Sequence, residues 1–130
     1  MAVEGSMPLR ASYVAGVDLS AQVNQYRAVK LGAANQLVLC VANTDVPIGI
    51  LQNRPPLGVA GFVVVVGHSK FKAAGITAAN DNLSVDAAGN LQTVAPAAAG
   101  RFVFGRVIES TAAINEVGSA YVDFTAPRPA

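Results

Sequence analysis

The sequence predicts an all-β protein: a small antiparallel β-barrel or sandwich with extended N- and C-terminal arms. Short runs rich in β-branched and aromatic residues recur along the chain, and clusters of Gly, Asn and Asp separate them at hairpin spacing. The 130 residues suit a single domain that can bury a core without disulfides or metal ions. We expect an N-terminal arm at residues 1–17, a β-domain at 18–124 and a C-terminal tail at 125–130.

The first half of the chain carries the pattern of three short strands. They are expected at residues 26–31, 37–41 and 47–51. Asp18 precedes a run that suits one turn of helix, so we expect it to cap residues 19–23. Pro47 has no backbone N–H, which confines the third strand to a sheet edge or makes this residue its start.

The second half of the chain contains the strongest strand signals. Strands are expected at residues 63–66, 83–86, 91–94, 102–109 and around 121–124. The run 63–66 is apolar on both faces, so either both faces are covered or one of them meets another chain. In the run 102–109, alternation predicts that the even-numbered residues share one face. Gly105 should mark a bulge or the close approach of another backbone.

The chain has an unusually small number of charges. Charged residues make up 13% of the sequence, against about 25% in ordinary soluble domains. Such a surface favours coverage by other chains, although a neutral polar surface of Ala, Ser, Asn, Gln and Thr is the alternative. The net charge is +1 and the basic residues are scattered, which argues against nucleic acid as a partner.

An assembly of this kind needs contact residues, and the sequence offers several apolar candidates. We expect partner contacts at Met7, Leu9, Tyr13, Val64, Phe71 and Tyr121. The first three lie in or next to the N-terminal arm, which would then lie on a neighbouring subunit. The alternative for the arm is a terminus without fixed structure.

The sequence shows no set of residues that would catalyse a reaction. Cys40 is the only cysteine and lies in an apolar run, which predicts a buried, inert thiol. His68 is the only histidine and has no evident partner for a metal site or for general-base work. Four oxygen-bearing residues, Asp81, Asn82, Asp86 and Asn90, could suggest Ca²⁺. They do not match the twelve-residue calcium loop, so we expect turn chemistry. We expect no catalytic residue, metal or cofactor.

Targeting signals are not evident either. The N-terminus lacks a basic stretch followed by an apolar one, and no apolar run approaches the ~20 residues of a membrane span. We therefore expect no membrane as a partner, and assembly in a cytoplasm.

A set of short motifs forms one ordered pattern along the chain. The motifs are Asp18-Leu19-Ser20, 26–30 (YRAVK), 48–53 (IGILQN) with Pro55-Pro56, 65–67 (VVG), 71–75 (FKAAG), 85–89 (VDAAG), 104–109 (FGRVIE) and Val117-Gly118. In that order they resemble the small capsid decoration, or cement, proteins of tailed bacteriophages. The likeness spans roughly residues 18–124. The chain departs from the commoner pattern at 77–82, where a glycine and an acidic residue are replaced.

The resemblance implies a barrel-like protein without enzymatic activity. Such proteins bind the exterior of an icosahedral phage head and stabilise contacts between subunits of the major capsid protein. The implied partners are the major capsid protein and further copies of the chain, commonly as a homotrimer, with a dimer as the other option. The implied location is the capsid exterior of the virion.

Two alternatives stand beside this interpretation. The first is a β-domain of a phage head fibre or tail protein that contacts the host surface. The second is an enzyme, because residues 15–19 (AGVDL) are similar to the first motif of trimeric dUTP pyrophosphatases. The other motifs of that enzyme family, a Gly-Arg-Ser-Ser stretch and a later Asp-Tyr-Arg-Gly stretch, are absent from the sequence.

Overall fold

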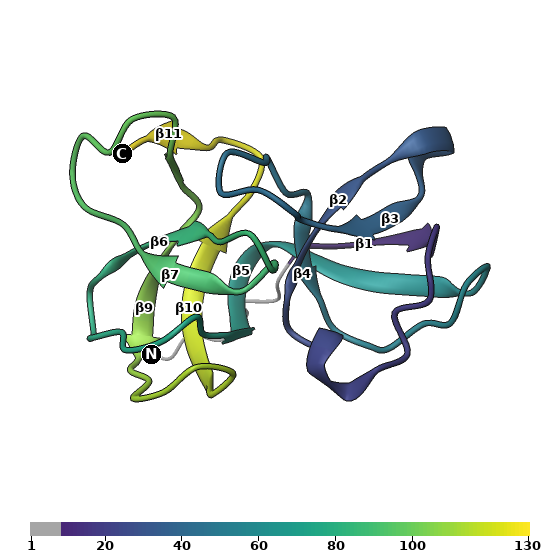
Figure 1. Cartoon of the computed structure of the whole chain (residues 1–130), viewed down its shortest axis with the longest axis horizontal. Coiled ribbons are helices and arrows are strands. Elements are labelled where there is room, and N and C mark those ends of the chain that lie inside the picture. Colours follow the sequence, from purple (N-terminus) through teal and green to yellow (C-terminus); the bar gives the residue numbers. More distant parts are fainter. Residues whose placement is uncertain (1–8) are drawn as a thin grey trace, which may run out of the picture.

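The computed structural model describes residues 9–130 and confirms the all-β prediction (Figure 1). Its strands are β1 (Leu9–Val14), β2 (Ala28–Leu31), β3 (Leu37–Leu39), β4 (Gly49–Leu51), β5 (Ala60–Lys72), β6 (Asn82–Val85), β7 (Leu91–Thr93), β8 (Phe102–Val103), β9 (Gly105–Glu109), β10 (Val117–Asp123) and β11 (Arg128–Pro129). Two 3₁₀ turns, η1 (Gln22–Asn24) and η2 (Ala33–Asn35), interrupt the first half. In residues 9–130, no helix is long and apolar enough to cross a bilayer.

One curled antiparallel sheet contains nine of the strands. Its order is β3-β2-β4-β5-β10-β9-β6-β7, with β1 paired to β5 outside this path, and β8 pairs with β11 in a small second sheet. Strand β5, with 13 residues the longest, runs from one lobe into the other and joins them (Figure 1). We call residues 9–66, with β1 to β4 and the start of β5, the first lobe. Residues 67–130 form the second lobe.

Strand β5 links the lobes because its two halves have different partners. β1 pairs with residues 60–66, whereas β10 pairs with residues 66–72. Val63 and Val64 have partners in both β1 and β4, and both side chains are buried. The apolar character of 63–66 on both faces is therefore explained by coverage within the chain itself. Gly67, with φ of 122°, lies where the partner changes.

The buried side chains of both lobes form a single hydrophobic core. Leu37, Ile50 and Leu51 contribute from the first lobe, and Phe71 and Phe104 from the second. The Phe104 ring stacks on Phe124 with centroids 5.3 Å apart. Burying side chains of this size contributes roughly 1.5–3 kcal/mol each, so the core holds the two lobes together.

The two terminal segments, which the sequence predicts to be extended arms, pair with strands of the same chain. Residues 9–14 of the predicted arm form β1 and pair with β5 along its first half. In the predicted tail, Arg128 and Pro129 pair with Val103 and Phe102. Both segments are extended, as expected, but in residues 9–130 they belong to the sheets.

Two local predictions are wrong. Asp18 does not cap a helix over 19–23; its side chain accepts a hydrogen bond from the Ser20 backbone N–H at 3.0 Å, and the helical turn begins later, at Gln22. The run 102–109 is not one alternating strand either, because it breaks at Phe104 and both Val103 and Phe104 are buried.

The expected close approach at Gly105 is present. A Cβ atom at this position would lie 2.6 Å from the carbonyl oxygen of Tyr121. Only glycine lets β9 and β10 come this close, so the sequence signal at Gly105 is explained by backbone packing.

Candidate partner-binding surfaces

Three of the six expected contact residues remain candidates in the described part of the chain. Leu9 is 57% exposed at the start of β1, and Tyr121 is 62% exposed on β10. Tyr13 is half-buried and packs against the core from β1. Met7 lies outside the described residues.

The other two expected contacts have a different role in this fold. Val64 and Phe71 are fully buried, Val64 between β1 and β4 and Phe71 in the second lobe. Their side chains belong to the core of the chain and are not part of the surface that a partner could contact. The sequence pattern identifies an apolar strand but does not reveal which face the chain covers by itself.

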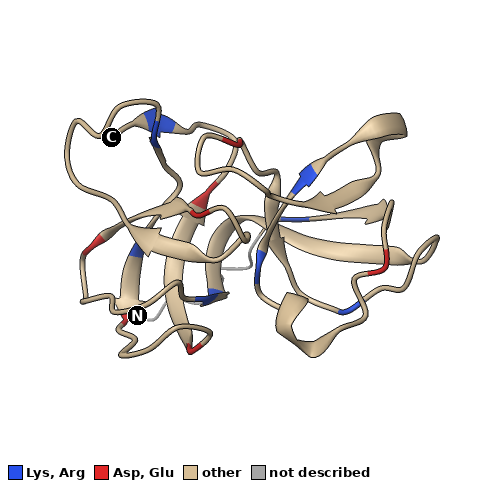
Figure 2. Ribbon diagram, viewed as in Figure 1, with Lys and Arg blue, Asp and Glu red and all other residues tan. Residues whose placement is uncertain are grey.

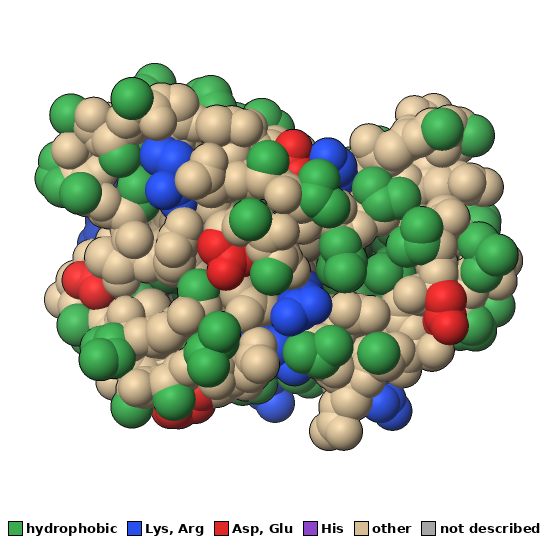
Figure 3. Space-filling model, viewed as in Figure 1, with side chains coloured by type: hydrophobic (Ala, Val, Ile, Leu, Met, Phe, Trp, Pro, Cys, Tyr) green, Lys and Arg blue, Asp and Glu red, His purple; other side chains and the backbone are tan. Residues whose placement is uncertain are grey.

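The first lobe exposes an apolar patch where β1 meets β5. The patch consists of Val14, Leu57, Val59 and Phe62, which are 44%, 65%, 47% and 49% exposed, respectively. Val14 is in register with Ala60, two residues before Phe62, and the backbone N–H of Ala15 donates to the Val59 carbonyl at 2.9 Å. Val14, Val59 and Phe62 therefore lie along the same end of the β1–β5 pair, and Leu57 lies in the turn just before it. Figure 3 shows many hydrophobic side chains over the lobe formed by β1 to β4, and others at the far end of the second lobe. A patch of this kind suits a lasting contact with another protein.

The outer face of β5, β10 and β9 in the second lobe is polar. Tyr121 is in register with His68 on β5 and with Arg106 on β9, and the His68 and Tyr121 rings lie 5.7 Å apart. In the next row Lys70 faces Ser119, whose hydroxyl donates to Glu109 at 2.7 Å. Figure 2 shows that residues of both charge signs are spread over the fold.

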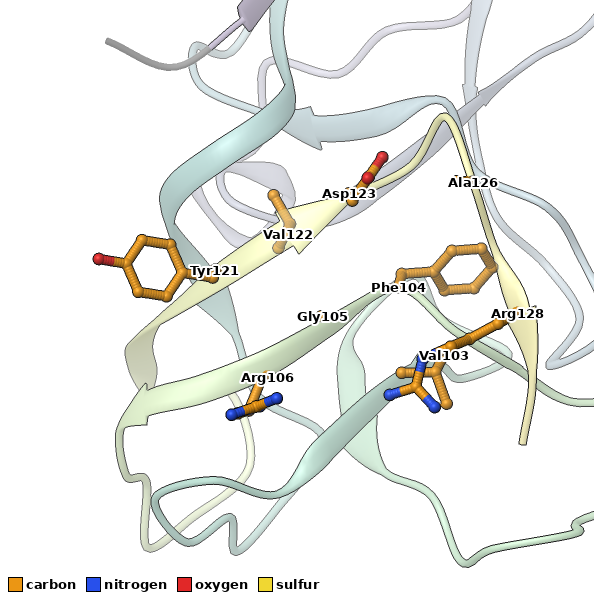
Figure 4. A pocket seen from close by; sticks show the side chains of 9 residues that line it. All are labelled: Val103, Phe104, Gly105, Arg106, Tyr121, Val122, Asp123, Ala126 and Arg128. Atoms are coloured by element: carbon orange, nitrogen blue, oxygen red, sulfur yellow. The ribbon is translucent and has the colours of Figure 1, made fainter. Parts of the chain in front are cut away.

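A groove of about 560 Å³ lies at one end of this face (Figure 4). It is lined by Val103, Phe104, Gly105, Arg106, Tyr121, Val122, Asp123, Ala126 and Arg128. A smaller depression of about 300 Å³ lies beside it, where Arg10, His68 and Lys70 meet Tyr26. The Lys70 ammonium lies 5.7 Å from the centre of the Tyr26 ring. Two shallow hollows with basic side chains therefore lie on the surface, one within the second lobe and one where the two lobes meet.

A hydrogen-bonded network joins the two lobes. Arg27 from the first lobe donates through Nε to Asn90 Oδ1 at 2.9 Å and through Nη1 to Asn24 Oδ1 at 3.3 Å. Asn90 is buried, and its amide nitrogen donates to Asn115 Oδ1 at 3.1 Å. Burial lowers the pKa of the nearby Lys72 ammonium, and the charge of Arg27 lowers it further. These groups are used in holding the lobes, which leaves them unavailable to a ligand.

Asp81 and Asp86 hold turns, as the sequence predicts. Asp86 Oδ1 accepts the backbone N–H groups of Ala88 and Asn90, both at 2.8 Å. Asp81 Oδ2 accepts the N–H of Ala78 at 2.9 Å and the hydroxyl of Thr93 at 2.9 Å. These carboxylates therefore stabilise turns in this fold. Among residues 9–130, no group of three or more His, Cys, Asp or Glu side chains could hold a metal ion.

Two further side chains bear on reactivity. Cys40 is buried, as predicted, and burial raises the pKa of its thiol to about 12. Asp123, at the edge of the groove, accepts the Thr125 hydroxyl at 2.6 Å and its backbone N–H at 2.9 Å. These hydrogen bonds hold the pKa of the Asp123 carboxyl below its usual range.

The same fold occurs in a solved phage structure. The N base of the head fibre gp8.5 of bacteriophage phi29 superposes with a TM-score of 0.65, at 14% identity, over 91% of this chain and 96% of that chain. This chain has the fold of a phage head-fibre base. The sequence matches no protein-family model and no curated protein. At this identity the likeness establishes the fold, and it covers both lobes.

The groove is the feature that the sequence did not reveal. Arg106 was expected on a strand and Arg128 in a tail, and only the pairing of β11 with β8 brings both to one hollow. Arg106 and Arg128 both lie beside apolar strand residues near the C-terminus, which is the one signal in the sequence. The sequence does not show that the two side chains lie close together.

Proposed function

We propose that this chain is a structural protein of a phage head and serves as the base domain of a head fibre. The observation that carries the proposal is the shared fold, which extends over nearly all of both chains and so is not the likeness of a common fragment. The small number of charges agrees with a protein that functions in permanent contact with other chains.

We assign the attachment to the head to the first lobe. Its apolar patch of Val14, Leu57, Val59 and Phe62 offers the side chains that wide, permanent interfaces prefer. The partners in this proposal are the major capsid protein and other copies of the chain. Repetition by the symmetry of the head would turn individually weak contacts into stable binding.

A capsid decoration protein is the second candidate. The ordered motifs across residues 18–124 favour it, and the same apolar patch would serve it. The two candidates differ in what the head loses when the protein is absent. Loss of a cement protein lowers the resistance of heads to heat and osmotic shock, whereas loss of a fibre base leaves that resistance unchanged and lowers adsorption to host cells.

Co-sedimentation with phage heads tests the shared part of the proposal. Purified protein should sediment with heads that lack it and should remain in the supernatant without them. A protein that stays in the supernatant at micromolar concentration in the presence of such heads would rule out both candidates.

A pair of double variants tests the assigned surface. Leu57→Asp with Phe62→Asp should weaken binding to heads at least ten-fold, because it places two carboxylates on the patch. The matched control is Ile76→Asp with Ile114→Asp, two side chains that are 80% and 65% exposed on the second lobe. The control should bind heads like the unaltered protein; equal losses in both variants would contradict the assignment.

A further inference from the structure

We infer that the groove between β9, β10 and β11 binds an acidic sugar, and that Arg106 and Arg128 hold its carboxylate. The two arginines reach the groove from separate strands, Arg106 from β9 and Arg128 from β11. Among the described residues neither forms an ion pair, and Arg128 Nη2 makes only a long hydrogen bond of 3.4 Å to Asn82 Oδ1. Two guanidinium groups without a carboxylate partner are well suited to a planar anion.

The opposite side of the groove has the opposite charge. Figure 4 shows Arg106 and Arg128 on one side of the paired strands β9 and β10, and Asp123 on the other. Thr125 keeps Asp123 ionised through two hydrogen bonds, so the carboxylate repels a second anion and accepts hydroxyl groups. A ligand that satisfies both sides carries a negative charge at one end and hydroxyl groups at the other.

The floor of the groove is apolar and leaves room for a ring. Phe104 and Val122 contribute apolar side chains, and Gly105 between the two arginines adds no side chain of its own. The volume of about 560 Å³ lies within the roughly 300–1,000 Å³ of small-molecule sites. Tyr121 lines the far end of the groove, with its ring turned outward toward His68 (Figure 4).

An acidic peptide fits this groove less well. Extended peptides usually bind by adding a strand to a free sheet edge. β9 is paired with β10 on one edge and with β6 on the other, so its backbone groups at the groove are already used. In residues 9–130, β11 pairs only with β8, but it is two residues long and includes Pro129, so it offers little edge for an added strand. Recognition by side chains is therefore favoured, and with it a compact, hydroxyl-rich anion.

Titration of the isolated, isotopically labelled protein with sodium glucuronate tests the inference by amide chemical shifts. We expect saturable shifts at Arg106, Tyr121 and Arg128, with a Kd on the order of 1 mM. Glucose and inorganic phosphate serve as the two comparison ligands, and both should bind at least ten-fold more weakly. Equal binding of phosphate would show a site for any anion, and the absence of saturable shifts in the groove would exclude the site; either result overturns the inference.

Substitutions separate the groove from the rest of the surface. Arg106→Gln and Arg128→Gln should each weaken glucuronate binding about ten-fold or more, because each removes charge-assisted hydrogen bonds. Arg54→Gln, on an exposed loop of the first lobe, should leave binding unchanged. Thermal unfolding checks that all three variants remain folded. Unchanged binding in both groove variants would overturn the inference, while the proposed attachment to heads, which is assayed separately, would stand.

Discussion

The two lobes share one sheet and one core but have different surfaces. Of the large hydrophobic side chains that are exposed, the first lobe has nine: Leu9, Val14, Val17, Val23, Val41, Val46, Leu57, Val59 and Phe62. The second lobe has five: Ile76, Ile108, Ile114, Val117 and Tyr121.

The charged residues have the opposite distribution. Six lie in residues 9–66: Arg10, Asp18, Arg27, Lys30, Asp45 and Arg54. Ten lie in residues 67–130: Lys70, Lys72, Asp81, Asp86, Arg101, Arg106, Glu109, Glu116, Asp123 and Arg128. An apolar lobe suits permanent attachment and a polar lobe suits contact with solvent and small ligands, so one fold provides two kinds of surface.

The largest expected effect comes from breaking the strand that the lobes share. Val64→Lys places an ammonium group in the core between β1 and β4, and should destabilise the protein by about 4 kcal/mol or more. Because β5 serves both lobes, both should unfold in a single transition. Urea unfolding followed by circular dichroism and by tyrosine fluorescence measures the size and the cooperativity of the change.

The control for this substitution lies on the same strand. Phe62 is 49% exposed, so Phe62→Lys should cost less than about 1 kcal/mol. A folded second lobe in Val64→Lys, seen as a separate second transition, would contradict the idea that the lobes depend on a common core.

A smaller effect compares two glycines, one in each lobe. A Cβ atom at Gly49 would lie 2.6 Å from the Val64 carbonyl oxygen, and one at Gly105 would lie 2.6 Å from the Tyr121 carbonyl oxygen. Each Gly→Ala change should therefore cost about 2–3 kcal/mol, since backbone atoms must move. Gly75 has no atom within 4 Å of such a Cβ, so Gly75→Ala should leave the midpoint of urea unfolding nearly unchanged. If Gly105→Ala were as mild as Gly75→Ala, the close packing of β9 on β10 would be in doubt.

The junction between the lobes should contribute less than the core. Asn90→Ala removes the partner of Arg27 and should cost about 1–2 kcal/mol, because buried polar groups lose their hydrogen bonds. Asn43 is exposed in the first lobe, and Asn43→Ala should change the free energy of unfolding by less than about 0.5 kcal/mol. Equal effects from the two substitutions would show that the network does not hold the lobes together.

The strands could be predicted from the sequence because their signals are local. The β-branched run at 63–66, the hairpin of 83–86 and 91–94, and the close approach at Gly105 all depend on residue type and spacing. The length of β5 was underestimated, since His68 and Ser69 are weak strand formers that pairing with β10 holds extended. In this segment, pairing with a distant strand overrides the low local strand propensity.

The surfaces could not be predicted because they depend on non-local pairing. Val64 and Phe71 looked like contact residues in an apolar sequence, but which faces are covered is decided by β1, β4 and β10, which lie far away in the chain. The groove depends in the same way on β11 returning to β8, which brings Arg128 near Arg106. Long-range pairing of this kind leaves little trace in one sequence.

The smallest expected effect concerns acid stability and compares one carboxylate in each lobe. In the first lobe Asp45 Oδ2 accepts the Val41 and Ala42 backbone N–H groups and pairs with Lys30 at 3.0 Å. The Val41 hydrogen bond is the main cause that lowers the pKa of Asp45 below its ordinary 3.8, and the Thr125 hydroxyl does the same for Asp123 in the second lobe.

A carboxyl whose pKa is lower in the folded state stabilises the protein above the ordinary pKa, and this stabilisation is lost as the pH falls through the folded value. Asp45→Asn and Asp123→Asn should therefore each lower the free energy of unfolding slightly at pH 7, by less than about 1 kcal/mol, because both carboxylates lie near solvent. The difference from the unaltered protein should shrink below pH 4. Urea unfolding at pH 7 and pH 3 measures both values. If a variant loses as much free energy of unfolding at pH 3 as at pH 7, the charge of that carboxylate is not the cause of the loss. The cause is then the geometry of the introduced Asn amide in that turn.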